Sequence, residues 1–291
     1  MYFYKLNICE TEKELYKTVL REPDLVILAV KYLSFESENN IWLSEYFTQH
    51  KIIYTGSSRS TLKFDSDKVL AKSHLKKVNI KTADFFTAIP GQYQSEQELP
   101  LLFPLFLKPT NAANGNGIDD LSFVTNFADF KSKVLSLYKL FEIPILVEEY
   151  LGGKEYTVAV IQTTNGELKV SPIEIVPALS TQGLRILGQK AKQDDLEELK
   201  KIEDHTIKQS LGQLAIDAFI GLEVRDFGRI DFKTNQAGEF FFMEANLVPG
   251  MTKGSSYFPK AYELENELSY DEVIECMISK GLARIASKES A

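Results

Sequence analysis

Hydrophobic and polar positions along the chain alternate in blocks that predict strands interleaved with helices. Residues 24–30 form a nearly uniform apolar run, typical of a parallel-sheet strand covered on both faces. Residues 10–21 carry Leu15, Val19 and Leu20 on one side, as an amphipathic helix does. Further strands are expected at 2–8, 51–54, 82–86, 145–147, 155–161 and 169–175, and another apolar strand should end at Lys108. Further helices are expected at 41–47, 67–77, 130–141, 196–220 and 270–286. This order predicts an N-terminal α/β unit followed by α+β units.

Composition narrows the class of protein. A chain of 291 residues with 44% apolar residues can bury a substantial core and contain two or three subdomains. Its net charge of -8 disfavours nonspecific nucleic-acid binding, so any phosphate site must be locally basic. Cys9 and Cys276 lack the spacing of a disulfide framework or thiolate metal site. The apolar runs are too short to cross a membrane, and the first residues do not resemble a signal peptide. We therefore expect a soluble, cytoplasmic protein without nucleic-acid or membrane partners.

The most informative segment is a predicted hairpin over residues 228–246, with a turn at 235–238. Because strand side chains alternate between faces, Arg229 and Asp231 should share one face of the first strand. By the same rule Glu244 and Asn246 should share one face of the second strand, opposite Met243 and Ala245. If the two faces are in register, an arginine, two carboxylates and an amide converge.

The residue types of this hairpin indicate chemistry with a hard cation. The flanking Phe, Ile and Met side chains predict burial, where an unpaired carboxylate would be costly. Oxygen donors from Asp231, Glu244 and Asn246 suit magnesium, and Arg229 could stabilise a developing negative charge. A salt-bridge cluster on the solvent face of an ordinary hairpin explains the same residues equally well, so the segment alone does not distinguish the two interpretations.

Several motifs occur in one order and together suggest a family. The C-terminal set is Gly228-Arg229-Ile230-Asp231, Met243-Glu244-Ala245-Asn246, Pro249-Gly250-Met251-Thr252 and Ser255. The upstream set is Asp24-Leu25-Val26, Tyr54-Thr55-Gly56-Ser57, Asp67-Lys68, Leu107-Lys108-Pro109, and residues 145–158 with Glu148-Glu149-Tyr150-Leu151 and Glu155. This pattern resembles the D-alanine–D-alanine ligases of the ATP-grasp superfamily over nearly everything after about residue 20.

The resemblance implies an α+β / α/β fold of the ATP-grasp kind. A shortened N-terminal α/β (preATP-grasp) unit would span residues 1–61. A central lobe with a lid loop would span 62–147, and a C-terminal lobe with the magnesium site and substrate loop would span 148–291. ATP would lie between the two lobes, with one or two Mg2+ ions, for which Mn2+ can substitute.

The same resemblance implies a role for individual residues. Nucleotide-binding residues would be Lys68, Lys108, Asn114, Gly115, Glu148, Glu149, Tyr150, Leu151, Glu155 and Lys190, with Arg185 as the alternative to Lys190. Metal ligands would be Asp231, Glu244 and Asn246. Catalytic and substrate-binding groups would be Arg229, Gly250 and Ser255.

Simpler interpretations exist for some of these residues. Lys68 shares its predicted helix region with Lys63, Lys72, Lys76 and Lys77, which taken alone indicates a solvated helix face. Lys108 at a strand end would otherwise be a surface residue. The repeated Asn-Gly at residues 114–117 is first a hairpin-turn signal, although such a tip can also cover phosphates.

The implied activity is that of an ATP-dependent carboxylate–amine ligase acting through an acyl phosphate. Residues 112–115 lack the hydroxyl groups that the family's lid uses for the first amino acid, so we expect an altered first-substrate pocket. Small amino acids or carboxylates would be the substrates, and family likeness makes a homodimer reasonable. The alternatives are a catalytically silent ATP-binding protein and an ATP-grasp kinase for a small molecule.

Overall fold

The structure, a computed structural model, describes residues 9–35, 40–112, 115–180, 183–189, 194 and 196–289. Three sheets organise these residues: a two-stranded ribbon, a four-stranded sheet and a five-stranded sheet. The expected strand at 2–8 lies outside the described residues. No helix of the described ranges is long and apolar enough to cross a membrane.

The N-terminal unit contains α1 (Glu12–Val19), β1 (Tyr32–Leu33), β2 (Ile41–Trp42) and α2 (Leu43–Gln49). The expected strands at 24–30 and 51–54 were wrong, because these segments meet only in one parallel bridge between Val26 and Tyr54. Leu28 is buried, whereas Ile27 and Val30 are about half exposed. The apolar run is therefore covered on one side instead of two.

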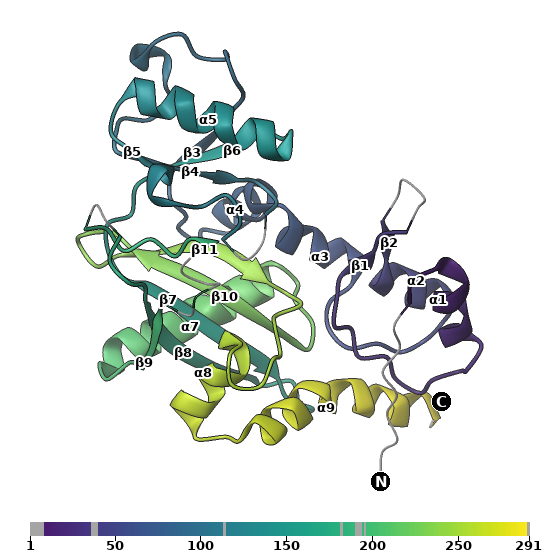
Figure 1. Cartoon of the computed structure of the whole chain (residues 1–291). Helices are drawn as coiled ribbons and strands as arrows, with labels where there is room; N and C mark the ends of the chain where they lie inside the picture. The colour runs from purple at the N-terminus through teal and green to yellow at the C-terminus, as the bar shows by residue number, and fades with distance from the viewer. Residues whose placement is uncertain are drawn as a thin grey trace.

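The four-stranded sheet has the order β3 (Phe85–Ala88), β6 (Ile145–Glu149), β4 (Leu105–Pro109) and β5 (Phe123–Val124). Helix α5 (Phe127–Phe141) covers one face, as Figure 1 shows. The short 3-10 helices η1 (Glu96–Glu98) and η2 (Asp120–Ser122) lie in its connections. Alternation turns Leu105 and Leu107 toward α5, and it leaves Phe106 and Lys108 on the opposite face.

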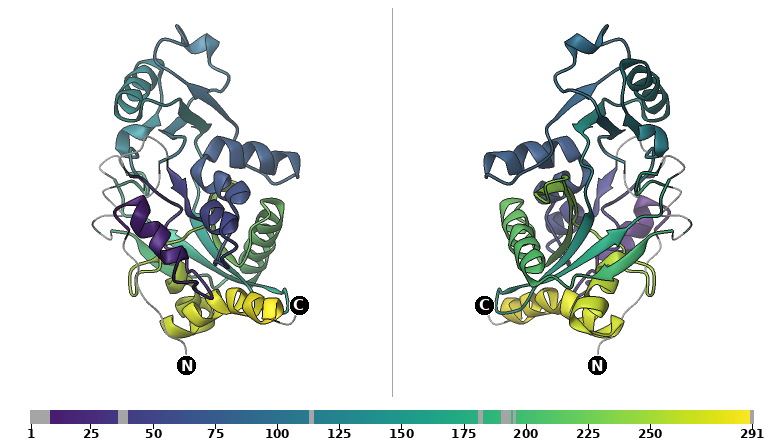
Figure 2. Two further views of the ribbon diagram at one scale, coloured as in Figure 1. Left: turned by 90° about the vertical axis from the view of Figure 1, so that its right-hand side faces the viewer. Right: turned by 90° about the vertical axis from the view of Figure 1, so that its left-hand side faces the viewer.

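The five-stranded sheet is antiparallel throughout. Its order is β11 (Phe240–Asn246), β10 (Phe227–Thr234), β7 (Glu155–Gln162), β8 (Leu168–Val176) and β9 (Glu198–Lys201). Helix α7 (His205–Gly221) packs on one face. Helices α8 (Tyr257–Asn266) and α9 (Tyr270–Glu289) pack on the other face. Figure 2 shows the sheet between these two helical layers.

Two expectations for this region were wrong. The helix predicted at 196–220 begins only at His205, because the Asp204 side chain caps it by accepting from the N–H groups of Thr206 and Ile207. The residues before Asp204 pair with β8 as the edge strand β9. No helix was expected between residues 220 and 270, yet α8 lies there.

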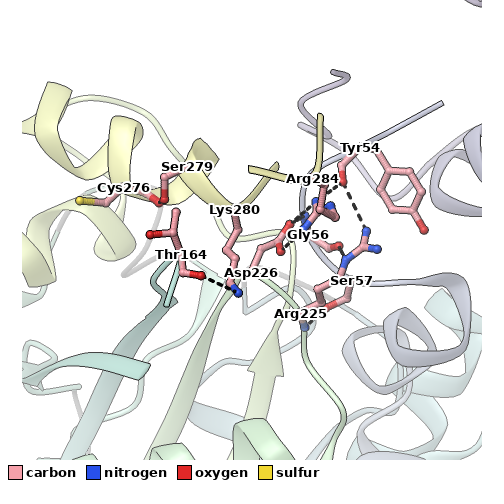
Figure 3. Close-up of polar contacts among 10 residues, drawn as sticks. All are labelled: Tyr54, Gly56, Ser57, Thr164, Arg225, Asp226, Cys276, Ser279, Lys280 and Arg284. Atoms are coloured by element: carbon pink, nitrogen blue, oxygen red, sulfur yellow. Dashed lines mark hydrogen bonds and ion pairs between the residues drawn. The ribbon is translucent and has the colours of Figure 1, made fainter. Parts of the chain in front are cut away.

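Helices α3 (Arg59–Ser66) and α4 (Lys68–Lys77) lead from the N-terminal unit to the region between the two large sheets (Figure 1). Asp226, which is 1% exposed, fastens the N-terminal unit to the rest of the fold. It accepts from the Gly56 N–H at 2.8 Å and from both terminal nitrogens of Arg284 on α9, at 2.6 and 2.8 Å (Figure 3). The neighbouring Arg225 donates to the carbonyls of Gly56 and Tyr54. Two arginines and one carboxylate thus join segments far apart in sequence.

Candidate functional site

A cleft lies between the two large sheets. Its described lining includes the apolar side chains of Ala83, Phe106, Ile118, Leu151, Ile175, Ile186, Leu187, Phe232 and Met243. The charged side chains that line it are Lys68, Lys108, Glu148, Glu149, Glu155, Asp231, Lys233 and Glu244. A cleft with a mixed apolar and charged lining suits a ligand with an aromatic part and an anionic part.

The hairpin brings its polar residues together as the alternation predicted. Arg229 lies opposite Asn246 in the β10–β11 register, and Asp231 lies opposite Glu244. Arg229 donates to both oxygens of Asp231 at 3.0 Å, and the Asn246 amide donates to Asp231 Oδ2 at 3.1 Å. The predicted convergence on one face is therefore confirmed.

A β-bulge changes the position of one residue in this hairpin. The register shifts between Asp231 and Phe232, so that Phe232 pairs with Phe242 and Met243 is the extra residue. Met243 lines the cleft, whereas alternation placed it on the face opposite Glu244. The expectation for Met243 was wrong because it assumed an unbroken ladder.

The alternative interpretation, a salt-bridge cluster on a solvent face, is right that Arg229 and Asp231 form an ion pair but wrong that the pair is exposed. Arg229 and Asp231 do pair, but their side chains are only 11% and 15% exposed, so the cluster is not on a solvent face. Burial would lower the pKa of Arg229, but the adjoining carboxylate of Asp231 raises it above its usual value. The arginine therefore stays charged beside the cleft.

The oxygen donors of the hairpin fit a magnesium ion in kind. No group of three or more Asp, Glu, His and Cys side chains forms a metal cage in the described part of the chain. Asp231 and Glu244 nevertheless face each other, with the Asn246 amide beside them. Two carboxylates and one amide are too few for an all-protein cage but suit an ion that shares its shell with water and phosphate oxygens.

Both lysines expected at the nucleotide are buried, so their interpretation as surface residues is wrong. Lys68 is 7% exposed, donates to the Ala112 carbonyl at 2.6 Å and lies 3.2 Å from Glu244 Oε2. Lys108 is 3% exposed and lies 2.5 Å from Glu148 Oε2. Both line the cleft, one from each side.

Two charged residues were missed from the sequence: Lys233, which lines the cleft, and Lys72, which lies near it. Lys72 was interpreted as part of a solvated helix face, but it is 0% exposed and pairs with Glu148 Oε1 at 2.6 Å. Burial lowers the pKa of Lys72 to about 8, against the opposing effect of Glu148. Burial would raise the pKa of Glu148, but the ammonium groups of Lys108 and Lys72 hold it below its usual value. The spacing of four puts Lys72 on the helix face of Lys68, but Lys76 continues the same spacing, so the sequence did not single out Lys72.

The segment after β6 supplies one wall of the cleft. Glu148, Glu149, Tyr150 and Leu151 all line it. The Glu149 side chain accepts from the Asp84 N–H at 2.9 Å, and the Tyr150 N–H donates to the Pro104 carbonyl. Glu155 also lines the cleft and pairs with Lys233 at 2.6 Å. Lys233 thus holds the Glu155 side chain at the cleft.

Two loops close over the cleft and touch through their backbones. A Cβ on Gly115, which has φ +70°, would lie 2.9 Å from the Gly188 carbonyl carbon. A Cβ on Gly188 would lie 2.5 Å from the Ile118 oxygen, and the Gln189 N–H donates to that oxygen at 3.2 Å. Asn114 and Lys190 lie outside the described residues. Arg185 donates to the Pro177 carbonyl and does not line the cleft.

The expected substrate loop, with Gly250 and Ser255, is outside the described lining of the cleft and leads into α8. Ser255 is exposed, and a Cβ on Gly250 would lie 2.8 Å from Ser256 Oγ. The Tyr257 ring lies 5.2 Å from the Arg229 guanidinium. Burial and the hydrogen bond to Glu197 raise the pKa of Tyr257, so its hydroxyl stays protonated. The start of α8, just after this loop, therefore contacts Arg229, whose partner Asp231 lines the cleft.

The sequence of this chain is similar to those of known D-alanine–D-alanine ligases. The family described as D-ala D-ala ligase C-terminus matches residues 74–279. A D-alanine–D-alanine ligase of Aquifex aeolicus is 28% identical over 78% of this chain and 73% of its own length. One from Marinomonas sp. is 31% identical over 69% of this chain and 61% of its own length. This chain therefore matches only part of each relative.

A solved structure shares the fold. The D-alanine–D-alanine ligase from Bacillus anthracis, determined in complex with ATP, superposes with a TM-score of 0.72. It is 21% identical in sequence, and the match covers 96% of this chain and 85% of that chain. The two lobes around the cleft therefore have the ATP-grasp arrangement.

Proposed function

The chain belongs to the D-alanine–D-alanine ligase family of ATP-dependent C–N ligases, and from that premise we propose that it joins a carboxylate to an amine through an acyl phosphate. One observation carries this proposal. Asp231 and Glu244 lie opposite each other on neighbouring strands, and both line the cleft together with Lys68 and Lys108. Carboxylates that can hold a metal, next to two cations, are what phosphoryl transfer requires.

In this proposal the nucleotide occupies the cleft between the two large sheets. Its base lies against the apolar lining near Tyr150 and Leu151, and Glu155 accepts from the ribose hydroxyls. Lys68 and Lys108 contact the phosphates. The loops that meet at Gly115 and Gly188 exclude water from the phosphates, which strengthens every charge interaction beneath them.

Asp231, Glu244 and Asn246 would hold one or two Mg2+ ions, with Mn2+ as a substitute. The metal would supply positive charge against the phosphate oxygens. Asp231 already accepts from Thr157, Arg229 and Asn246, so at least one of these donors must move to admit a metal. Rotation of the Asn246 amide would present its oxygen in place of its nitrogen.

The chemistry begins with a carboxylate, which does not react with amines because oxide is a poor leaving group. A carboxylate oxygen of the first substrate attacks the γ-phosphorus of ATP, the bond to the bridging oxygen breaks, and ADP leaves. Lys68 and Lys108 offset the charge on the transferring group. The product is an acyl phosphate, whose phosphate is a good leaving group.

The amine of the second substrate then attacks the acyl carbon, loses a proton and displaces phosphate, which leaves an amide. Arg229 and the Gly250 N–H stabilise the oxyanion that forms on the acyl oxygen. The Ser255 region binds the carboxylate of the second substrate. No covalent bond to the protein is required.

The first substrate would differ from that of the relatives. Ala112 contributes its carbonyl to Lys68 where the family uses hydroxyl-bearing residues, so this side of the pocket is less polar. We propose small amino acids or other small carboxylates as substrates. The homodimer and the division at residues 61 and 147 stay predictions.

The test is a screen for ADP release across pairs of L- and D-amino acids and small hydroxy acids, with amide formation followed by mass spectrometry. Release that requires both a carboxylate and an amine supports the ligase. Release with one substrate and no amide indicates a kinase, and nucleotide binding without release indicates a silent binding protein.

Glu244→Gln provides the matched variant for this screen. It should lower ADP release about 100-fold or more, because one metal ligand loses its charge. Glu239→Gln is the control, since Glu239 lies at the tip of the same hairpin, is half exposed and pairs with Lys81 away from the cleft. Equal activity of the two variants would remove Glu244 from the site.

A further inference from the structure

Lys72 is a buried cation close to the nucleotide cleft without being part of its described lining. It lies on α4 one turn after Lys68 and is 0% exposed. An ammonium group loses its hydration when buried, at a cost of several kcal/mol unless other groups replace the water. The groups that contact the Lys72 ammonium must therefore replace the water that it has lost.

The contacts of Lys72 connect the two lobes. Its Nζ forms an ion pair with Glu148 Oε1 on β6 at 2.6 Å. The same Nζ donates to the Phe242 carbonyl on β11 at 3.0 Å. Phe242 comes two residues before Glu244. Lys72 thus lies between the strand that carries Glu148 and the hairpin that carries the proposed metal ligands.

Glu148 is shared by two lysines, one on each oxygen. Lys108 lies 2.5 Å from Oε2 and lines the cleft. Lys72 contacts Oε1 and is not part of the described lining. Two ammonium groups against one carboxylate leave a net charge of +1 in a buried place. Of the two lysines, only Lys108 is positioned to contact a ligand in the cleft.

We propose that Lys72 is a positioning residue that keeps Glu148 compensated, so that Lys108 can leave Glu148 and bind a phosphate of the nucleotide. This proposal rests on the proposed function of the cleft. Without Lys72, Glu148 would have Lys108 as its sole cation, and moving Lys108 to a phosphate would leave a buried carboxylate unpaired. A lysine suits this exchange because its ammonium is a compact point charge on a flexible stem.

The test compares two probes that differ only in phosphate. Adenosine and ADP are titrated calorimetrically into the whole chain and into Lys72→Met. Lys72→Met should weaken ADP binding about tenfold, the size of one charge-assisted hydrogen bond, and leave adenosine within about twofold. A purely structural role for Lys72 would weaken both probes equally, and that result would overturn the proposal.

A double-mutant cycle with Lys108→Met makes the test specific. If Lys72 acts through Lys108, adding Lys72→Met to Lys108→Met should not weaken ADP binding further. Additive losses would show that the two lysines act independently and would refute the inference. Lys76→Met is the matched control, because Lys76 lies on the same helix, is about half exposed and pairs with the exposed Asp84.

A second comparison covers the case in which Lys72→Met does not fold. Glu148→Gln removes the charge that Lys72 compensates, so Glu148→Gln and Lys72→Met/Glu148→Gln should bind ADP alike. A tenfold weaker double variant would overturn the proposal. Absence of ADP and adenosine binding by the unsubstituted chain would instead reject the nucleotide site itself, a result distinct from a failure of Lys72 alone.

Discussion

Two buried carboxylates in this molecule are compensated in different ways. Asp226 is held by the planar guanidinium of Arg284, which donates to both of its oxygens, and by the Gly56 N–H (Figure 3). Glu148 is held by the ammonium groups of Lys72 and Lys108. A bidentate guanidinium pair is rigid, whereas an ammonium can turn to another acceptor. Asp226 therefore joins two parts of the fold through a fixed pair, whereas our proposal is that Glu148 holds the Lys108 ammonium until a ligand takes it.

The largest expected effect is on turnover at the Glu148 cluster. Lys108→Met removes one of the cations that line the cleft. It should lower ADP release about 100- to 1,000-fold, because the charge on the transferring phosphoryl group loses a preorganised partner. The measurement is steady-state ADP release with a substrate pair found in the screen. A loss below about threefold would place Lys108 with Asp226 among the groups that only hold the fold.

The next largest expected effect is on the free energy of unfolding when Asp226 is substituted. Asp226→Asn should lower the free energy of unfolding by about 3 kcal/mol, the low end for a broken buried pair, because the Arg284 side chain is 29% exposed. Denaturant titration measures the loss. Asp84→Asn is the control, since its pair with Lys76 is exposed on both sides and should contribute under about 1 kcal/mol.

The ratio of ADP affinity to adenosine affinity should also distinguish the role of Asp226 from that of Glu148. The ratio of ADP to adenosine affinity should stay unchanged in Asp226→Asn, because Asp226 is not among the residues that line the cleft. A change in that ratio would mean that the junction at Asp226 controls the phosphate site, and the distinction between the two carboxylates would be lost.

The smallest effect is a dependence on pH. Lys72 has a pKa lowered to about 8, and the charged groups around it are Glu148, Lys108 and Glu244. Above about pH 8, loss of its proton should weaken ADP binding relative to adenosine, and Lys72→Met should lack this change. Between pH 8 and the ordinary lysine value of 10.5 the folded chain binds fewer protons than the unfolded chain, so this group makes stability rise with pH. Calorimetric titrations at pH 7.5 and 9 test the first expectation.

Local patterns predicted the elements near the site better than those elsewhere. The hairpin, α4, α5 and the strands β6, β7 and β8 occur where alternation and helical spacing indicated. The segment at 24–30 failed because an apolar run does not reveal whether a second layer covers it. Strand β9 failed because its pairing with β8 comes from residues distant in sequence.

The candidate site shows the same limit. Arg229, Asp231, Glu244 and Asn246 could be grouped from sequence because a strand turns alternate side chains to one face. Lys72 could not be separated from Lys76 in the same way. Both are lysines on one helix, yet one is fully buried and the other about half exposed.

By itself the sequence determined the oxygen donors and the arginine of the hairpin, since backbone geometry places them on one face whatever packs nearby. Tertiary structure alone decided that Met243 turns into the cleft at a bulge, that two loops meet through Gly115 and Gly188, and that Glu148 is shared by two lysines. The physical reason is that side-chain direction follows from neighbouring bonds, whereas burial and charge pairing depend on what the fold brings to the other side.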